Sequence, residues 1–307
     1  MADTAPPPIP FGARSTADEV LAGIDLTGRT ILLTGCTTGI GFETMRALAW
    51  HGAHVMALAR TEQAAQAAAT KAGVAVTPIA CDLGDLASVM RAVAAVRGLG
   101  RKLDAIIASA GVMGGRKAQL LHGIERQFLI NHVAHFLLVT RLMDLVPDGT
   151  GRVVIVSSSA SIGLAPTKGI LFGNLDARRG YRALRFYGQS KLANALFARE
   201  LARRVAGRGI TANAVHPGVI LGTQLVRNMA WPIRVAIGLA GRFSKSLAQG
   251  AATQTLVAAS PLVQGITGKF WADCQVAEGS RHMDDPAMSG QLWTVTEDII
   301  ARELGEN

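Results

Sequence analysis

Charge, aromatic residues and cysteine are all scarce in this 307-residue chain. Only 17% of the residues are charged and 5% are aromatic, whereas 49% are hydrophobic. The three cysteines, Cys36, Cys81 and Cys274, stand far apart without redox or metal spacing, which argues against a disulfide framework and a zinc site. A chain this apolar can bury a large core, which argues against disorder. We therefore expect a globular protein of a reducing compartment, the cytoplasm.

Signals for nucleic-acid binding, export and membrane spanning are missing as well. The 31 Lys and Arg exceed the 22 acidic residues, but they are scattered without interleaved aromatics, unlike a nucleic-acid surface. No apolar run reaches the ~18 residues of a spanning helix, and the N-terminal proline run lacks the apolar core of a signal peptide. The segment Met229–Phe243 could still lie on a bilayer surface, so peripheral membrane contact stays open. The mean hydropathy of +0.28 favours a homo-oligomer, a dimer or tetramer.

Short apolar runs alternate with alanine-rich helical segments from Thr30 onward. The expected strands are residues 31–33, 54–59, 74–80, 103–108, 152–156 and 210–215, and the expected helices are 41–50, 62–71, 86–96, 120–145 and 184–205. Because the strand runs are apolar throughout, helices should cover both faces of the sheet. The pattern predicts one α/β domain over residues 27–307, a doubly wound Rossmann-type fold with about seven parallel strands, after an N-terminal arm over residues 1–26.

Two excursions interrupt this rhythm, at residues 159–181 and 219–245. Long excursions at the carboxyl ends of strands usually hold substrate. The second contains an apolar stretch with Trp231 and Pro232, and we interpret it as a mobile lid over a lipophilic substrate. A plain packing or dimer helix is the alternative.

A glycine-rich turn directly follows the first expected strand. It reads Thr34-Gly35-Cys36-Thr37-Thr38-Gly39-Ile40-Gly41 and ends where a helix is expected. Glycines let the chain turn sharply and let backbone N–H groups approach a pyrophosphate, which the helix N-terminus attracts. The flanking strand and helix favour a dinucleotide site over a glycine turn without a ligand. The predicted contacts are Gly35, Thr37, Thr38, Gly39, Ile40 and Gly41.

Residues after the second and third strands bear on which dinucleotide binds. An NAD site usually carries an acid after the second strand, whereas the 2′-phosphate of NADP requires a cation. Arg60 stands there with no acid beside it, so we predict NADP(H) over NAD(H), with a solvated arginine at a helix start as the alternative. Asp82, followed by Leu83, either accepts from the adenine amino group or simply opens the next helix.

Tyr187 and Lys191 stand four residues apart in an expected helix, which places the phenol and the ammonium on one face. Tyrosine is a poor base at its usual pKa of about 10, and a neighbouring cation favours the phenolate. We therefore expect Lys191 to lower the pKa of Tyr187, so that Tyr187 exchanges a proton with an alcohol or carbonyl while a nicotinamide carries the hydride. Ser157-Ser158-Ser159, directly after a strand, adds a hydroxyl for hydrogen bonding.

With these features together, residues 28 to about 275 resemble the short-chain dehydrogenase/reductase family. The segment Tyr187–Leu201 and the turn His216-Pro217-Gly218 are similar to its retinol dehydrogenase and WW-domain oxidoreductase branch, although no WW domain is present. The resemblance implies that Ser158 binds the substrate oxygen, that Tyr187 is the acid/base and that Lys191 holds the nicotinamide ribose. It further implies that Asn131 supports a relay water, and that the dinucleotide also contacts Asp82, Leu83, Ala110, Gly111, Pro217, Gly218, Val219 and Thr223.

Two departures from the family pattern stand out. The family's Asn-Asn-Ala-Gly is Ala108-Ser109-Ala110-Gly111 here, which removes amide hydrogen bonds and implies lower local rigidity, and Thr223 comes one residue later than usual. His132 and His135 lie three residues apart, but no third ligand accompanies them, so we predict no metal site. Cys274 is expected to be a buried small residue rather than a substrate contact.

Taken together, the sequence predicts an NADP(H)-dependent alcohol dehydrogenase or carbonyl reductase that acts on a bulky, apolar small molecule. Two alternatives stay open. One is a C=C reductase of the protochlorophyllide reductase type, because that branch shares the glycine loop and the Tyr/Lys pair. The other is a non-catalytic regulator that binds the dinucleotide, because fold alone does not fix activity.

Overall fold

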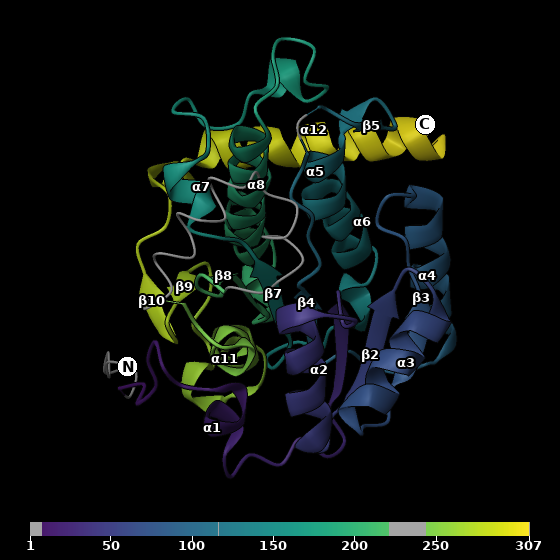
Figure 1. The fold of residues 1–307 in the computed structure, drawn as a ribbon, viewed down its shortest axis with the longest axis vertical. Helices are drawn as coiled ribbons and strands as arrows, with labels where there is room; N and C mark the ends of the chain where they lie inside the picture. Colours follow the sequence, from purple (N-terminus) through teal and green to yellow (C-terminus); the bar gives the residue numbers. More distant parts are fainter. Residues whose placement is uncertain (1–7, 116, 221–243, 307) are drawn as a thin grey trace.

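A computed structural model of the chain describes residues 8–115, 117–220 and 244–306 (Figure 1). Its central sheet has eight strands in the order β10-β9-β8-β7-β4-β1-β2-β3. Seven strands run parallel, as predicted, and β10 adds an antiparallel strand at one edge. The bounds are β1 (Thr30–Thr34), β2 (His54–Ala59), β3 (Thr77–Ala80), β4 (Ala105–Ala108), β7 (Arg152–Val156), β8 (Thr211–His216), β9 (Phe270–Ala272) and β10 (Gln275–Ala277).

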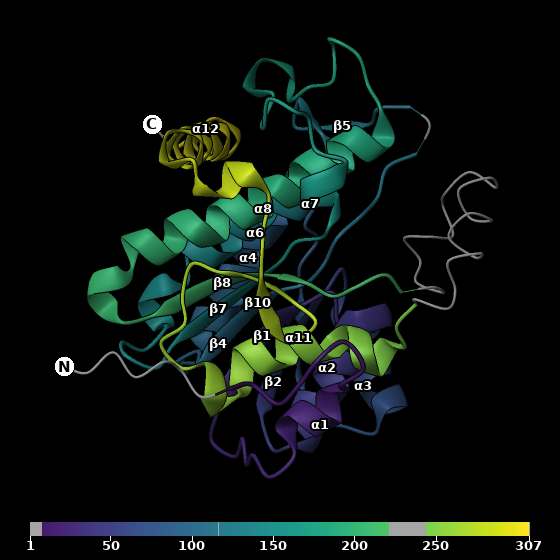
Figure 2. The same cartoon turned by 90° about the vertical axis from the view of Figure 1, so that its left-hand side faces the viewer.

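Helices cover both faces of the sheet, as the apolar strands require (Figure 2). The two helix layers pack against opposite faces of the sheet, and each layer belongs to a separate hydrophobic core cluster. The first layer contains α4 (Leu86–Gly98), α6 (Ala134–Thr140), α8 (Ala183–Arg204) and α12 (Pro286–Leu304). The second contains α1 (Ala17–Leu21), α2 (Gly39–Trp50), α3 (Glu62–Ala72) and α11 (Leu247–Ala259).

The strand order reverses between β1 and β4, which lie side by side although β2 and β3 separate them in the chain. In open α/β sheets, ligands bind beyond the carboxyl ends of strands at such a switch point. The chain leaves β1 at Thr34 and β4 at Ala108, directly before the glycine turn and before Ser109. The fold thus brings the two loops expected to bind dinucleotide to the same place.

The helix predicted over residues 120–145 is the main error in the expected elements. The segment instead begins with a small hairpin of β5 (Leu120–Leu121) and β6 (Ile124–Glu125). His122 and Gly123 connect these strands with φ of 52° and 67°, the left-handed geometry of a two-residue hairpin turn. The helix starts only at α5 (Arg126–Phe128), passes through a π-helical turn at Leu129–Val133, and continues as α6. The other expected elements occur with ends shifted by up to three residues.

The N-terminal arm predicted over residues 1–26 includes α1, whose Ala17, Val20 and Leu21 are buried in the same core as α11. A capping box at Thr16 starts this short helix. Its packing ties the arm to the domain, while the domain boundary itself stays a prediction. The expected lid residues 221–243, including Thr223, lie outside the described residues.

Candidate active site

The glycine turn forms a tight cradle between β1 and α2. Gly35 has a φ of 78°, and a Cβ added to it would come within 2.8 Å of the Ala110 Cα. A Cβ on Gly41 would overlap the Gly35 carbonyl. Thr38 is the N-cap of α2 but its side chain makes no cap hydrogen bond, so the first N–H groups have no side-chain acceptor there. This cradle, which only glycines fit, suits the pyrophosphate of a dinucleotide.

Arg60 and Asp82 lie at the same edge of the sheet, just after β2 and β3. Arg60 is exposed, and no residue of the described ranges forms an ion pair or hydrogen bond with its side chain. Asp82 accepts a hydrogen bond from the Gly84 N–H at 2.9 Å, while Asp85 is the N-cap of α4. The reading of Asp82 as the residue that opens the helix is therefore wrong; its predicted contact with adenine stays a prediction.

The loop after β4 is held by side chains from other strands and helices. Thr34 Oγ1 accepts hydrogen bonds from the N–H groups of Ser109 and Ala110, both at 3.0 Å. The Ser109 hydroxyl donates to Gln254 of α11 at 3.3 Å. These bonds lie in the segment Ala108–Gly111, where the departure from the family's Asn-Asn-Ala-Gly implied a loss of amide hydrogen bonds. Thr34 and Gln254 therefore anchor the loop, while the implied lower rigidity stays a prediction.

Asn131 lies in the π-helical turn, and its side chain makes three hydrogen bonds. Its Oδ1 accepts from the Val112 N–H at 2.7 Å, and its Nδ2 donates to the Val112 carbonyl and to Ser190 Oγ, each at 2.9 Å. Ser190 in turn donates to the Tyr187 carbonyl at 2.8 Å. Asn131 therefore joins the loop after Gly111 to the helix that carries Tyr187 and Lys191.

Tyr187 and Lys191 occupy one face of α8, as their spacing predicts. The Lys191 Nζ lies 5.9 Å from the centroid of the Tyr187 ring and donates to the Val156 carbonyl at 2.9 Å. A Cβ on Gly111 would lie 3.3 Å from the same Nζ, so the loop after β4 reaches this pair. Ser158 follows β7, and its side chain hydrogen-bonds that of Tyr187. Three elements, β4, β7 and α8, thus converge on one point.

The electrostatics of this pair differ from the sequence-based expectation. Burial raises the pKa of the Tyr187 hydroxyl to about 12, although its hydrogen bond with Ser158 acts in the opposite direction. Burial also lowers the pKa of Lys191 to about 8. The expected lowering of the Tyr187 pKa by Lys191 does not hold here, because both side chains, 8% and 3% exposed, have lost their water. At neutral pH the phenol is protonated.

The turn after β8 also lies at the carboxyl ends of the strands. Gly218 has a φ of 92°, and a Cβ on it would lie 2.6 Å from Cδ of Lys245. The Lys245 N–H donates to the Val219 carbonyl at 2.9 Å, and its Nζ pairs with Asp273 at 2.6 Å. Burial, and then the charge of Lys245, lower the pKa of His216 to about 4. His216 is therefore neutral, and the turn that includes Pro217 is fixed by Lys245.

Proteins of a known family are similar to this chain over most of its length. A short chain dehydrogenase model matches residues 29–169. The WW domain-containing oxidoreductase of Homo sapiens is 34% identical over 306 residues, 96% of this chain and 73% of that protein. Short-chain dehydrogenase TIC 32 B, chloroplastic, of Brassica napus is 35% identical over 296 residues, 92% of each chain. This chain belongs to the short-chain dehydrogenase/reductase family.

Solved structures place this short-chain dehydrogenase in the same fold. The angucycline C-6 ketoreductase LanV with bound NADP is 28% identical, with a TM-score of 0.64 over 81% of this chain and 95% of that one. The predicted family and Rossmann-type fold are thereby confirmed. General oxidoreductase chemistry with a nicotinamide dinucleotide follows from the family.

The two histidines of this dehydrogenase that drew attention as a metal pair point to different partners. His132 Nε2 bonds Thr296 of α12 at 3.0 Å, and His135 Nε2 bonds Thr34 of β1 at 2.9 Å. Among the residues that the structure describes, no three His, Cys, Asp or Glu side chains gather as metal ligands. Cys274 is fully buried beside Thr253, which confirms its interpretation as a packing residue.

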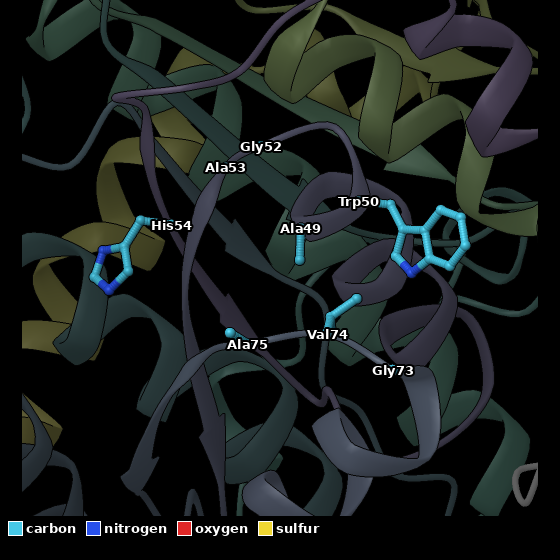
Figure 3. A pocket seen from close by; sticks show the side chains of 8 residues that line it. All are labelled: Ala49, Trp50, Gly52, Ala53, His54, Gly73, Val74 and Ala75. Atoms are coloured by element: carbon cyan, nitrogen blue, oxygen red, sulfur yellow. The ribbon is translucent and has the colours of Figure 1, made fainter.

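A pocket of about 450 Å³ opens at the opposite edge of the sheet (Figure 3). Trp50 at the end of α2, His54 at the start of β2 and Val74 after α3 are among its lining residues. These residues lie at the amino ends of the strands, whereas Tyr187 lies near their carboxyl ends.

In the described ranges, none of the dehydrogenase's helices is long and apolar enough to cross a bilayer.

Four residues that hold the loops at the carboxyl ends of the strands were not predicted in that role: Thr34, His135, Lys245 and Gln254. Each acts on the loops through contacts that link segments far apart in the chain, and only Thr34 belongs to a short motif. A positive-φ glycine next to a long side chain, as at Gly218 and Lys245, is visible only in the folded structure. The Thr at the end of β1 was the one available signal, because it directly precedes the glycine turn.

Proposed function

We propose that this dehydrogenase uses NADP(H) to interconvert a carbonyl and an alcohol on a bulky, apolar small molecule, with Tyr187 as the acid/base. The observation that carries the proposal is the convergence of Ser158, Tyr187 and Lys191 beside the glycine cradle. A hydroxyl donor, a protonated phenol and an ammonium within one buried site suit proton transfer to a carbonyl oxygen.

A bound nicotinamide would supply or take the hydride. The residues of the chain itself would hold and transfer the proton. With its pKa raised to about 12, the Tyr187 hydroxyl holds its proton at neutral pH and can donate it to the oxygen of a ketone under reduction. The Ser158 hydroxyl, already within hydrogen-bond reach of Tyr187, would orient the same oxygen. The protonated phenol suits the proton donation that reduction requires, and the reverse reaction requires the phenolate as a base.

Exposed apolar side chains lie on the segments that follow Ser158 and Gly218 in the chain. Ile162 and Leu164, on and after α7 (Ala160–Gly163), and Val219, after Gly218, are exposed by 51%, 41% and 51%. A Cβ on Gly188 would lie 2.5 Å from the Leu164 carbonyl carbon, so α7 touches α8 directly beside Tyr187. Large apolar side chains that stay exposed on these segments favour an apolar substrate.

Turnover on a chemical panel tests the reaction. We expect NADPH oxidation with bulky, apolar ketones or aldehydes, and the corresponding alcohol as the product by mass spectrometry. Consumption of the C=C bond of an enone with its ketone intact would instead favour the alkene reductase. Tight dinucleotide binding with no turnover across the panel would favour the regulator.

Arg60 tests the choice of dinucleotide. We expect Arg60→Ala to weaken NADPH binding about 10- to 100-fold and to leave NADH binding almost unchanged, because a charge-assisted phosphate contact contributes about 1.5–3 kcal/mol. Fluorescence titration of both dinucleotides measures the change. Arg101→Ala is the matched control, since Arg101 is also exposed but precedes β4 at the amino ends of the strands. An unchanged preference for NADPH in Arg60→Ala would remove the proposed role of Arg60.

The remaining parts of the proposal concern assembly and location. We infer a homo-oligomer, a dimer or tetramer, in the cytoplasm, with membrane contact no closer than a bilayer surface. Exposed apolar side chains such as Trp50, 67% exposed, support association between subunits. Light scattering at several concentrations measures the subunit number, and a monomer throughout would contradict this inference.

A further inference from the structure

His135 connects the base of the glycine cradle to Asn131 inside the protein. Its Nε2 lies 2.9 Å from Thr34 Oγ1, and its Nδ1 lies 3.0 Å from the Asn131 carbonyl oxygen. The imidazole is fully buried, and burial lowers its pKa to about 4, with the charge of Lys191 adding to the effect. The ring is therefore neutral and carries a single proton, on one nitrogen or the other.

The hydrogen-bond partners decide which nitrogen is protonated. Thr34 Oγ1 already accepts two bonds, from the N–H groups of Ser109 and Ala110. A hydroxyl has two acceptor positions and one proton, so the Thr34 proton must point to His135 Nε2. The Asn131 carbonyl can only accept, so His135 Nδ1 must carry the hydrogen. Both ends of the ring independently require the Nδ1–H tautomer.

The same Asn131 holds the other end of the network. Through its side chain it binds Val112, and through Ser190 it reaches the Tyr187 carbonyl. The chain of bonds therefore runs from the strand that enters the glycine cradle, through His135 and Asn131, to the turn of α8 that carries Tyr187. Gly35, next to Thr34, contacts Ala110 closely, so a shift of Thr34 would move the cradle as well.

We propose that His135 is a positioning residue that holds the dinucleotide cradle and the Tyr187 turn in register with each other. It touches neither substrate nor dinucleotide; it acts through Thr34 and Asn131. The inference deepens the proposed function, on which it rests for its catalytic part, while its effect on dinucleotide binding is independent of turnover.

His132 provides a matched control within the same helical segment. It is equally buried, its pKa is also lowered by burial, to about 3, and its polar partners are Thr296 and Asn194. Its aromatic neighbours Phe128 and Phe197 belong to the core. Replacing either histidine by leucine removes polar bonds from a buried site at nearly constant volume. Only the His135 change severs the bridge between the cradle and Asn131.

The test compares His135→Leu, His132→Leu and His135→Asn. We expect both leucine variants to lower Tm, but only His135→Leu to lower kcat, by about tenfold or more, and to weaken NADPH binding by about tenfold. His135→Asn keeps an N–H near the position of Nδ1 and should recover most of kcat. NADPH titration monitors the cradle without any substrate.

Four results would overturn the proposal. They are equal losses of kcat in both leucine variants, unchanged kcat and NADPH affinity in His135→Leu, no recovery in His135→Asn, and nitrogen NMR of His135 with the proton on Nε2. Failure of the proposed reaction would appear differently, as a parent protein that binds NADPH but turns over no carbonyl. In that case weaker NADPH binding in His135→Leu still supports the positioning role.

Discussion

Tyr187→Phe is expected to lower kcat for ketone reduction by about 10²- to 10⁴-fold, the range that a positioned general acid contributes. Phenylalanine removes the proton that the phenol holds at neutral pH and leaves the volume of the site almost unchanged. Tyr187 is buried, and the polar bond it loses is the one to Ser158. NADPH affinity should therefore change little while kcat falls. Steady-state kinetics and NADPH titration separate the two effects.

The second tyrosine of the chain supplies the control. Tyr181 precedes α8, accepts a bond from Gln127 at 3.3 Å and donates to the Gly115 carbonyl at 3.4 Å. Tyr181→Phe removes a phenol from the neighbourhood of the site without touching the Lys191 pair, so kcat should stay within about twofold of the parent. A Tyr187→Phe enzyme as fast as the Tyr181→Phe enzyme would show that another group supplies the proton.

The fold and the residue types of the site could be predicted because they depend on local pattern. Apolar strands such as Arg152–Val156 are buried on both faces, and this leaves a clear signature in the sequence. The glycine cradle and the Tyr187/Lys191 spacing are also local, since a strand, a tight turn and one helical turn fix their geometry. Sequence and structure therefore agree on which elements meet at the site.

The errors arose where distant segments decide the outcome. The helix expected from Leu120 gave way to a hairpin because the His122-Gly123 turn allows two short strands to pair. The pKa of Tyr187 moved opposite to expectation because the rest of the core removes its water, an effect that spacing along one helix cannot reveal. The role of His135 could not be predicted either, because its partner Thr34 lies about a hundred residues away in the chain and only the fold places the two side by side.

Lys191→Met is expected to stabilise the protein at pH 7 and at the same time to lower kcat by at least about 100-fold, the loss that follows removal of one electrostatic group from an active site. Burial of a charged lysine costs stability: a pKa lowered from 10.5 to about 8 corresponds to about 3 kcal/mol. Methionine removes this cost. The Val156 carbonyl keeps a partner, because Asn194 also donates to it at 3.0 Å.

The pH dependence of unfolding tests this account. The unfolded chain holds the Lys191 proton up to pH 10.5, whereas the folded chain releases it near pH 8. Between these values the unfolded state binds more protons, so this lysine makes stability rise with pH, and below pH 8 its full cost remains. Methionine should therefore raise Tm at pH 7 by several degrees and much less at pH 10. An equal or lower Tm for Lys191→Met at pH 7 would mean that the surroundings stabilise the buried ammonium. Burial of Lys191 would then carry no cost in stability.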